Sequence, residues 1–221
     1  MDYSWIEIAV AAIFFSVVVT LILSRGYGWL SPTFWRNAAV VSSLVMTFIL
    51  LWLTFDTADQ VRPGSGRIPD WTVINHEIKL VWDAEKRRQV PAVGRETGFF
   101  GKTWSQKEAF DLINKGKMTL QSRNCMECHQ ILGNGAYYAT DLTRAWLDPW
   151  WEERIMPLTG AKTREEAMMA WLKDPTSMPQ GPRKMPNLRF TDEELKALIA
   201  FLKWMSAIDT NGFPPRFAVA Q

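Results

Sequence analysis

The sequence predicts a mainly α-helical protein, in which a two-helix transmembrane hairpin anchors a small helical domain outside the membrane. Three observations support this fold class. Two long apolar segments lie within the first 55 residues, three helix-capping patterns lie after residue 104, and the only two cysteines form one short motif. We expect an anchor at 1–55, a linking, aromatic-rich segment at 56–104 that is irregular or partly β, and the helical domain at 105–221.

The anchor consists of two almost wholly apolar stretches, residues 8–23 and 38–55, neither of which contains a charged side chain. Each approaches the ~20 residues needed to cross about 30 Å of hydrocarbon. A cleaved signal peptide is the alternative for the first stretch. That alternative expects a basic start and a small-residue cleavage site, whereas residues 1–7 contain no lysine or arginine. We therefore expect two transmembrane helices.

The loop between these helices sets their orientation. Residues 25–37 carry Arg25 and Arg36 and no acidic residue, which predicts a cytoplasmic position. Both termini and the helical domain then lie on the outer side of the membrane, the periplasmic side of a bacterial inner membrane. The first 55 residues contain two basic and two acidic residues of the 25 and 23 in the chain, so the remainder is almost neutral. Nothing in this balance suggests nucleic-acid binding.

The segment at 56–104 is the hardest to interpret. Residues 56–70 are rich in Asp, Pro, Gly and Ser, which predicts a linker. Partial alternation at 71–82 allows a short strand, whereas 87–91 and 94–101 predict a turn and a loop. The aromatic content is high for an exposed tether. The segment therefore either adds a small subdomain to the helical domain or docks on a partner, and the sequence leaves both alternatives open.

Three Ser/Thr-x-x-Glu patterns mark helix starts in the C-terminal domain. They pair Ser105 with Glu108, Thr163 with Glu166, and Thr191 with Glu194. The predicted helices cover about 105–118, 163–173 and 191–207, and the last has apolar residues spaced three and four apart. Gly116 fits either a close crossing of the first and last helices or an ordinary helix C-terminus.

The run Cys125-Met126-Glu127-Cys128-His129 is the attachment signature of c-type haem. Two thiols on one helical turn bond covalently to the porphyrin vinyl groups, and the following histidine is the proximal iron ligand. A zinc site would need further ligands, and His76 is the only histidine left. A thioredoxin-like pair would follow a strand, and a disulfide needs no adjacent histidine. We therefore predict one covalent haem c, bound through Cys125, Cys128 and His129.

The order of elements is that of the class I cytochrome c fold: a helix, the haem motif, long loops with a middle helix, and a terminal amphipathic helix. Haem c is attached outside the cytoplasmic membrane, which agrees with the predicted orientation. The second axial ligand is sought among ten methionines. Met185, in the loop before the last helix, is preferred, with Met178 and His76 as alternatives. A His/Met pair raises the reduction potential and leaves no site for substrate, which favours electron transfer.

Three separated motifs resemble the cytochrome c subunit of bacterial nitric oxide reductase. They are HQILGNGAYYA at 129–139, RKMP at 183–186, and FLKW with IDTN and Pro-Pro between 201 and 215. The resemblance implies that haem c passes electrons from a soluble cytochrome c or small copper protein to a large membrane subunit. There, haem b, haem b3 and a non-haem iron reduce nitric oxide to nitrous oxide. The resemblance also implies that Met185 is the axial methionine.

In this family the Gly-Ala-Tyr stretch lies at the subunit interface and helps to bind calcium, which implies roles for the Gly135 carbonyl and the Tyr137 hydroxyl. The chain departs from the family pattern in two ways. It has two predicted transmembrane helices where one is usual, and residues 56–104 are longer than the usual tether. Both departures leave the mode of assembly open.

Three other functions compete with this one. They are a cytochrome c subunit of a haem-copper oxygen reductase, a membrane-anchored electron carrier without a catalytic partner, and a haem gas sensor with an open sixth position. Because the chain contains only two histidines, it cannot itself hold further haems or a His-rich metal site. Arg183, Lys184 and Arg189 are either ordinary loop charges or a surface that steers an acidic donor.

Overall fold

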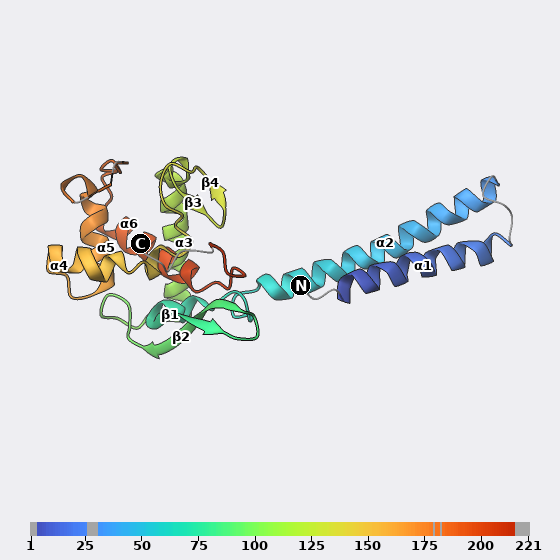
Figure 1. Ribbon diagram of the computed structural model, residues 1–221, viewed down its shortest axis with the longest axis horizontal. Helices are drawn as coiled ribbons and strands as arrows, with labels where there is room; N and C mark the ends of the chain where they lie inside the picture. Colours follow the sequence, from blue (N-terminus) through green and yellow to red (C-terminus); the bar gives the residue numbers. More distant parts are fainter. Residues whose placement is uncertain (1–3, 26–30, 179, 182, 215–221) are drawn as a thin grey trace. The chain divides into compact units, whose positions relative to one another are not determined.

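The computed structural model describes residues 4–25, 31–178, 180–181 and 183–214 (Figure 1). It divides into two compact units, Met1–Gln60 and Val61–Gln221. Part of the predicted cytoplasmic loop (26–30), Pro179 and Pro215 lie outside the described residues. The mainly helical fold class is confirmed.

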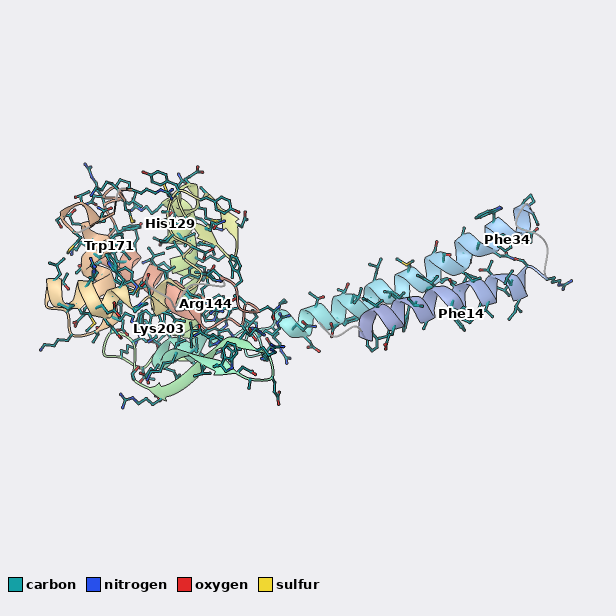
Figure 2. The ribbon with its side chains drawn as sticks, in the orientation of Figure 1. Phe14, Phe34, His129, Arg144, Trp171 and Lys203 are labelled. Atoms are coloured by element: carbon teal, nitrogen blue, oxygen red, sulfur yellow. The ribbon has the colours of Figure 1, made fainter. Side chains whose placement is uncertain are left out.

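The first unit is a pair of helices, α1 (Ser4–Leu23) and α2 (Pro32–Val61), that run side by side (Figure 1). Both are long and apolar enough to cross a membrane. They approach each other where Ser24 is buried and where the Asn37 amide donates to the Leu23 carbonyl at 3.4 Å. Most other side chains of both helices, such as Phe14 (Figure 2), are exposed and apolar, as a lipid-facing surface requires.

The predicted anchor boundary at residue 55 lies inside α2, which continues to Val61. Residues 56–61 are therefore helical and not part of the linker. The reason is that the first helix-breaking residues after the apolar stretch are Pro63 and Gly64, so nothing at 56–61 interrupts the backbone hydrogen bonds.

The second unit is built on the crossing of α3 (Gln106–Ser122) and α6 (Asp192–Ser206). Ser105 and Thr191 form complete capping boxes with Glu108 and Glu194, as predicted. Thr163 caps α5 (Arg164–Lys173) without a complete capping box, because the Glu166 carboxylate accepts from the Lys162 N–H at 2.8 Å and not from the Thr163 N–H.

The sequence did not predict the short helices between the haem motif and α5, which are η3 (Ala145–Leu147), η4 (Trp151–Ile155) and α4 (Met156–Thr159). The remaining short helical turns are η1 (Trp71–Asn75), η2 (Cys125–Glu127) and η5 (Pro175–Ser177).

Residues 76–96 form an antiparallel hairpin of β1 (His76–Asp83) and β2 (Arg88–Glu96), with Asp83 paired to Arg88 and Ile78 to Val93. The prediction of a turn and loop across most of β2 was wrong. Pro91 and Gly94 are tolerated because the sheet has only two strands. Among the described residues no further strand lies on the other edge of β2, so the two residues interrupt no backbone hydrogen bonds there. The possibility of a strand within 71–82 was correct for its second half.

The hairpin and its flanking residues pack against the helical domain. Phe99 is fully buried, and the Trp71 ring stacks on Trp204 of α6 with centroids 4.9 Å apart. The Asn75 side chain pairs with both backbone groups of Trp104 at 2.8 Å. Of the two alternatives for this segment, a subdomain added to the helical domain accounts for these aromatic residues.

An ion-pair cluster ties the hairpin to the loop after α6. The Arg88 guanidinium donates to both carboxylate oxygens of Asp209, and the Lys86 ammonium lies 3.3 Å from the same carboxylate. Asp209 is largely buried, and its N–H donates to the Arg67 carbonyl at 2.9 Å. The Arg88 guanidinium lowers the pKa of Asp209 to about 2.

We expect Asp209→Asn to destabilise the domain at neutral pH and to have a smaller effect in acid. The Asp209 carboxylate has a lower pKa in the folded than in the unfolded state, so its contribution is present above pH ~4 and is lost as the pH falls towards 2. The expected loss at pH 7 is about 2 kcal/mol. Urea unfolding at pH 7 and pH 3 measures it. The exposed surface pair of Asp192 with Lys173 offers Asp192→Asn as a control that should change stability little. Equal losses in the two variants would contradict the prediction.

Lys203 of α6 is an unusual core residue, with 1% of its surface exposed. Its ammonium lies 3.6 Å from the Glu165 carboxylate and 4.5 Å from the centroid of the Trp146 ring. Burial lowers the pKa of Lys203 to about 8. The residue therefore joins α6, α5 and η3 through one buried charge.

We expect stability to rise with pH as Lys203 loses its proton. Between pH 8 and 10.5 the unfolded chain keeps the proton that the folded chain has released, so the free energy of unfolding increases by on the order of 2–3 kcal/mol. In Lys203→Met this contribution should be absent. Urea midpoints of both proteins at pH 7 and pH 10 measure the difference. If the difference in the free energy of unfolding between the wild type and Lys203→Met is the same at pH 7 and pH 10, Lys203 does not titrate in this range.

Candidate functional site

The haem motif folds as a single tight turn. It starts after Asn124, which has a left-handed backbone (φ 52°), and continues through η2. The N–H groups of Cys128 and His129 donate to the Cys125 carbonyl at 3.3 and 2.9 Å. The two cysteines are not bonded to each other, and Cys125 is buried. Residues three apart on such a turn lie on one face, as attachment to two vinyl groups requires.

His129 is held in one tautomer by the chain that follows it. Its Nδ1 lies 2.7 Å from the Thr140 carbonyl oxygen. Because a carbonyl can only accept, Nδ1 carries the proton and Nε2 has a free lone pair. Burial lowers the pKa of His129, which favours this neutral form. A neutral imidazole oriented through its other nitrogen is the arrangement that a metal ligand needs.

The residues after His129 fold back over the motif. β3 (Gln130–Ile131) and β4 (Asn134–Gly135) form a small hairpin, whose turn residues Leu132 and Gly133 both have positive φ. Such a turn is typical of two-residue hairpins. Two backbone N–H groups of the next loop then donate to motif carbonyls, from Ala136 to Met126 and from Ala139 to Cys128, and the Leu142 N–H donates to the Gln130 carbonyl of β3. These bonds hold the segment that carries the Thr140 carbonyl against the motif.

The two residues predicted to bind calcium differ in their surroundings. At Gly135 (φ 120°) a Cβ would lie 2.2 Å from the His129 carbonyl oxygen, so the fold itself requires glycine there. Tyr137 has 79% of its surface exposed, and its carbonyl accepts from Arg183 at 3.1 Å. The described residues contain no cluster of three acidic, His or Cys side chains that could hold a metal. Calcium at Gly135 and Tyr137 therefore stays a prediction that depends on a partner.

The candidate axial methionines lie in the loop between α5 and α6. Met185 is half-buried and packs against the hydrophobic core of the domain, and its N–H donates to the Gln180 side chain. Met178 is also half-buried, but it is not among the side chains that pack against that core. His76 starts β1, and its Nδ1 lies 3.2 Å from the Gly94 carbonyl. Packing therefore favours Met185, and its ligation remains a prediction.

Unpaired buried polar atoms test whether haem fits this domain. Within the described ranges, the Trp171 indole nitrogen, Arg144 Nε and one Asp141 carboxylate oxygen are buried without a hydrogen-bond partner. Figure 2 labels Trp171 on α5, Arg144 and His129. Such orphaned groups are rare in complete proteins. The Trp171 indole N–H, a donor without an acceptor, fits a group that brings carboxylate oxygens, and haem has two propionates.

Sequence reasoning did not identify Thr140, Arg144 or Trp171 as site residues. Thr140 acts through its backbone carbonyl, which has no sequence signature. Trp171 has the spacing of an ordinary core residue of its helix. Arg144 lies in a loop where a basic residue is normally solvated, so only its burial distinguishes it.

Comparison with known proteins follows the same division of the chain. The cytochrome c family model matches residues 113–206. The chain is similar to the C subunit of nitric oxide reductase from Halomonas halodenitrificans, with 36% identity over 100 residues that span 45% of this chain and 63% of that protein. It is also similar to the C subunit of nitric oxide reductase from Stutzerimonas stutzeri, with 31% identity over 116 residues, 52% of this chain and 73% of that protein. A weaker similarity, 26% identity over 98 residues, links 44% of this chain to 27% of cytochrome c oxidase subunit 2 of Alkalihalophilus pseudofirmus.

Proposed function

The chain belongs to the family of nitric oxide reductase C subunits, the electron-transfer subunits of that reductase, and from this premise we propose how its haem domain works. The domain takes electrons from a soluble cytochrome c or small copper protein and passes them to a large catalytic membrane subunit. This partner holds haem b, haem b3 and a non-haem iron, and reduces nitric oxide to nitrous oxide.

The observation that carries the proposal is the orientation of His129 by Thr140. A 2.7 Å hydrogen bond from Nδ1 leaves Nε2 free to ligate iron. Cys125 and Cys128 would hold the porphyrin covalently, Met185 would take the other axial position, and Trp171 offers an unpaired N–H to a propionate. Haem c, when bound, supplies a one-electron iron couple. If His129 and Met185 both bind the iron, substrate would have no place on it, so we propose that the chain is a relay with no catalytic centre of its own.

We infer that this relay lies at a bacterial inner membrane, with the loop between α1 and α2 in the cytoplasm and the haem domain in the periplasm. Both helices are long and apolar enough to cross the bilayer, which supports this location. The basic residues Arg25 and Arg36 support this orientation through the positive-inside rule.

The Gly135–Tyr137 stretch faces the large catalytic partner. The high exposure of Tyr137 leaves its hydroxyl available to a calcium ion whose other oxygen ligands come from the partner. Tyr137→Phe should lower the calcium content of the purified complex, while Tyr138→Phe is the matched control at the neighbouring exposed tyrosine. Unchanged calcium in Tyr137→Phe would remove this residue from the site.

The test of the function is purification of the complex from membranes through a tag on this chain. We expect a large His-rich subunit with haem b and non-haem iron, and nitric oxide consumption measured with an electrode. A copper-containing partner that consumes oxygen would instead establish the runner-up, a subunit of a haem-copper oxygen reductase. Purification of the chain alone, with reversible oxidation by soluble acceptors, would favour a free-standing carrier.

A further inference from the structure

Arg144 is a buried cation that the relay described above does not use. Only 2% of its surface is exposed. Its Nη2 donates to the Thr210 hydroxyl at 3.0 Å, and its Nε has no hydrogen-bond partner among the described residues. A guanidinium remains charged at all ordinary pH values. The domain therefore encloses one full positive charge at this position.

No carboxylate within the described part of the chain forms an ion pair with Arg144. Asp209 is the acid whose charge acts on it, but Asp209 already accepts from Arg88 and lies beside Lys86. The charge of Arg88 opposes that of Arg144, and burial lowers the pKa of Arg144. Buried charges are normally paired, so this one is undercompensated by the protein.

Arg144 ends the segment that holds the proximal histidine. Within five residues, the Thr140 carbonyl accepts from His129, the Leu142 N–H donates to Gln130, and the Thr143 hydroxyl accepts from the Leu132 N–H at 2.7 Å. Residues 140–143 thus run along residues 129–132. Four residues span at most about 14 Å, so the backbone of Arg144 lies within about that distance of the Thr140 carbonyl that orients His129.

We propose that Arg144 is a potential-setting residue, whose buried and undercompensated positive charge stabilises the reduced state of the haem. Reduction adds one electron to the iron, and a nearby cation favours the state with the additional negative charge. Within a protein interior this interaction is screened much less than between exposed charges. The inference depends on haem binding by this domain and not on the identity of the catalytic partner.

The experiment is a spectroelectrochemical titration of haem c in the full-length chain. Arg144→Gln should make the haem harder to reduce, with a several-fold lower ratio of reduced to oxidised haem at a fixed potential; a tenfold change corresponds to about 59 mV for one electron. Arg144→Lys should keep most of the wild-type potential. The shift should persist at high salt, because the charge is buried.

Three further measurements separate charge from structure. Lys117→Gln removes an exposed charge from α3 and should shift the potential little. Thr210→Val removes the hydrogen-bond partner of Arg144 and keeps the charge, so it should leave the potential near that of the wild type. The oxidised and reduced haem spectra of every variant report whether the axial ligands are intact.

A wild-type potential in Arg144→Gln with an unchanged haem spectrum would overturn the proposal. An equal shift in Thr210→Val or in Arg144→Lys would also overturn it, because the effect would then follow the hydrogen bond or the side-chain shape and not the charge. If Arg144→Gln does not accumulate haem, Arg144→Met, a second variant without the charge, replaces it in the same comparison. Loss of nitric oxide reduction without a potential shift would bear on the proposed function alone.

Discussion

Replacing Met185 with alanine should abolish the methionine–iron charge-transfer band of the oxidised haem and lower its reduction potential by on the order of 0.1 V or more. The thioether sulfur is a soft ligand that stabilises the reduced iron, and water or hydroxide in its place favours the oxidised state. The haem itself should remain attached, because Cys125, Cys128 and His129 are unchanged. Visible spectra and potentiometric titration of the membrane-anchored protein measure both effects.

Met178→Ala is the matched control for this prediction, because Met178 lies in the same loop and also precedes a proline. It should retain the band and the potential. Persistence of the band in Met185→Ala together with its loss in Met178→Ala would assign the axial position to Met178. An open sixth position, which a gas sensor requires, would appear as a wild-type spectrum without the band and with rapid binding of added ligands.

Replacing Gly116 with alanine should destabilise the haem domain by about 3 kcal/mol or more, the upper range for overpacking a core. A Cβ at this position would lie 2.0 Å from the Ala197 carbonyl oxygen and 2.9 Å from the Phe201 Cβ. The nearest obstacle is the backbone of α6, which cannot move without opening the α3–α6 crossing. Helix propensity acts in the opposite direction, since alanine is favoured over glycine by about 1 kcal/mol inside a helix. The sign of the measured change therefore shows which effect dominates.

Chemical unfolding followed by far-UV circular dichroism measures the Gly116 effect. Gly66→Ala is the control, because no atom lies within 4 Å of a Cβ built there and its backbone is not left-handed. That variant should be neutral within about 0.5 kcal/mol. A stabilised Gly116→Ala protein would mean that the two helices cross at a greater distance than these contacts require.

The predictable part of this fold depends on local patterns. Helix starts at Ser105, Thr163 and Thr191 follow from side-chain caps three residues before a glutamate, and the structure has all three caps. The two apolar helices follow from length and composition. β2 was missed because a two-stranded hairpin has little buried surface and permits Pro91 and Gly94, which weakens the alternating pattern on which strand prediction depends.

The contacts that the sequence could not predict are long-range. From sequence, Gly116 fitted a close helix crossing and a helix C-terminus equally well. The structure decides for the crossing, because the backbone of Ala197, 81 positions away, lies against it. The hairpin could have been a docking surface until Arg88 was found paired with Asp209. Charged residues such as Lys203 and Arg144 are solvated in most proteins, and only the packing of several elements around them shows that they are buried.

The sequence alone therefore determined the two apolar N-terminal helices, the Cys-x-x-Cys-His motif and the helical class, because hydrophobic composition, the chemistry of haem attachment and helix capping each impose a short-range residue pattern. Only the tertiary structure decided that Thr140 orients His129, that residues 71–104 belong to the haem domain, and that Arg144 and Lys203 carry buried charge. These properties depend on which distant segments meet. A backbone carbonyl or a buried charge is defined by its neighbours in space, and a single sequence does not encode those neighbours in any local pattern.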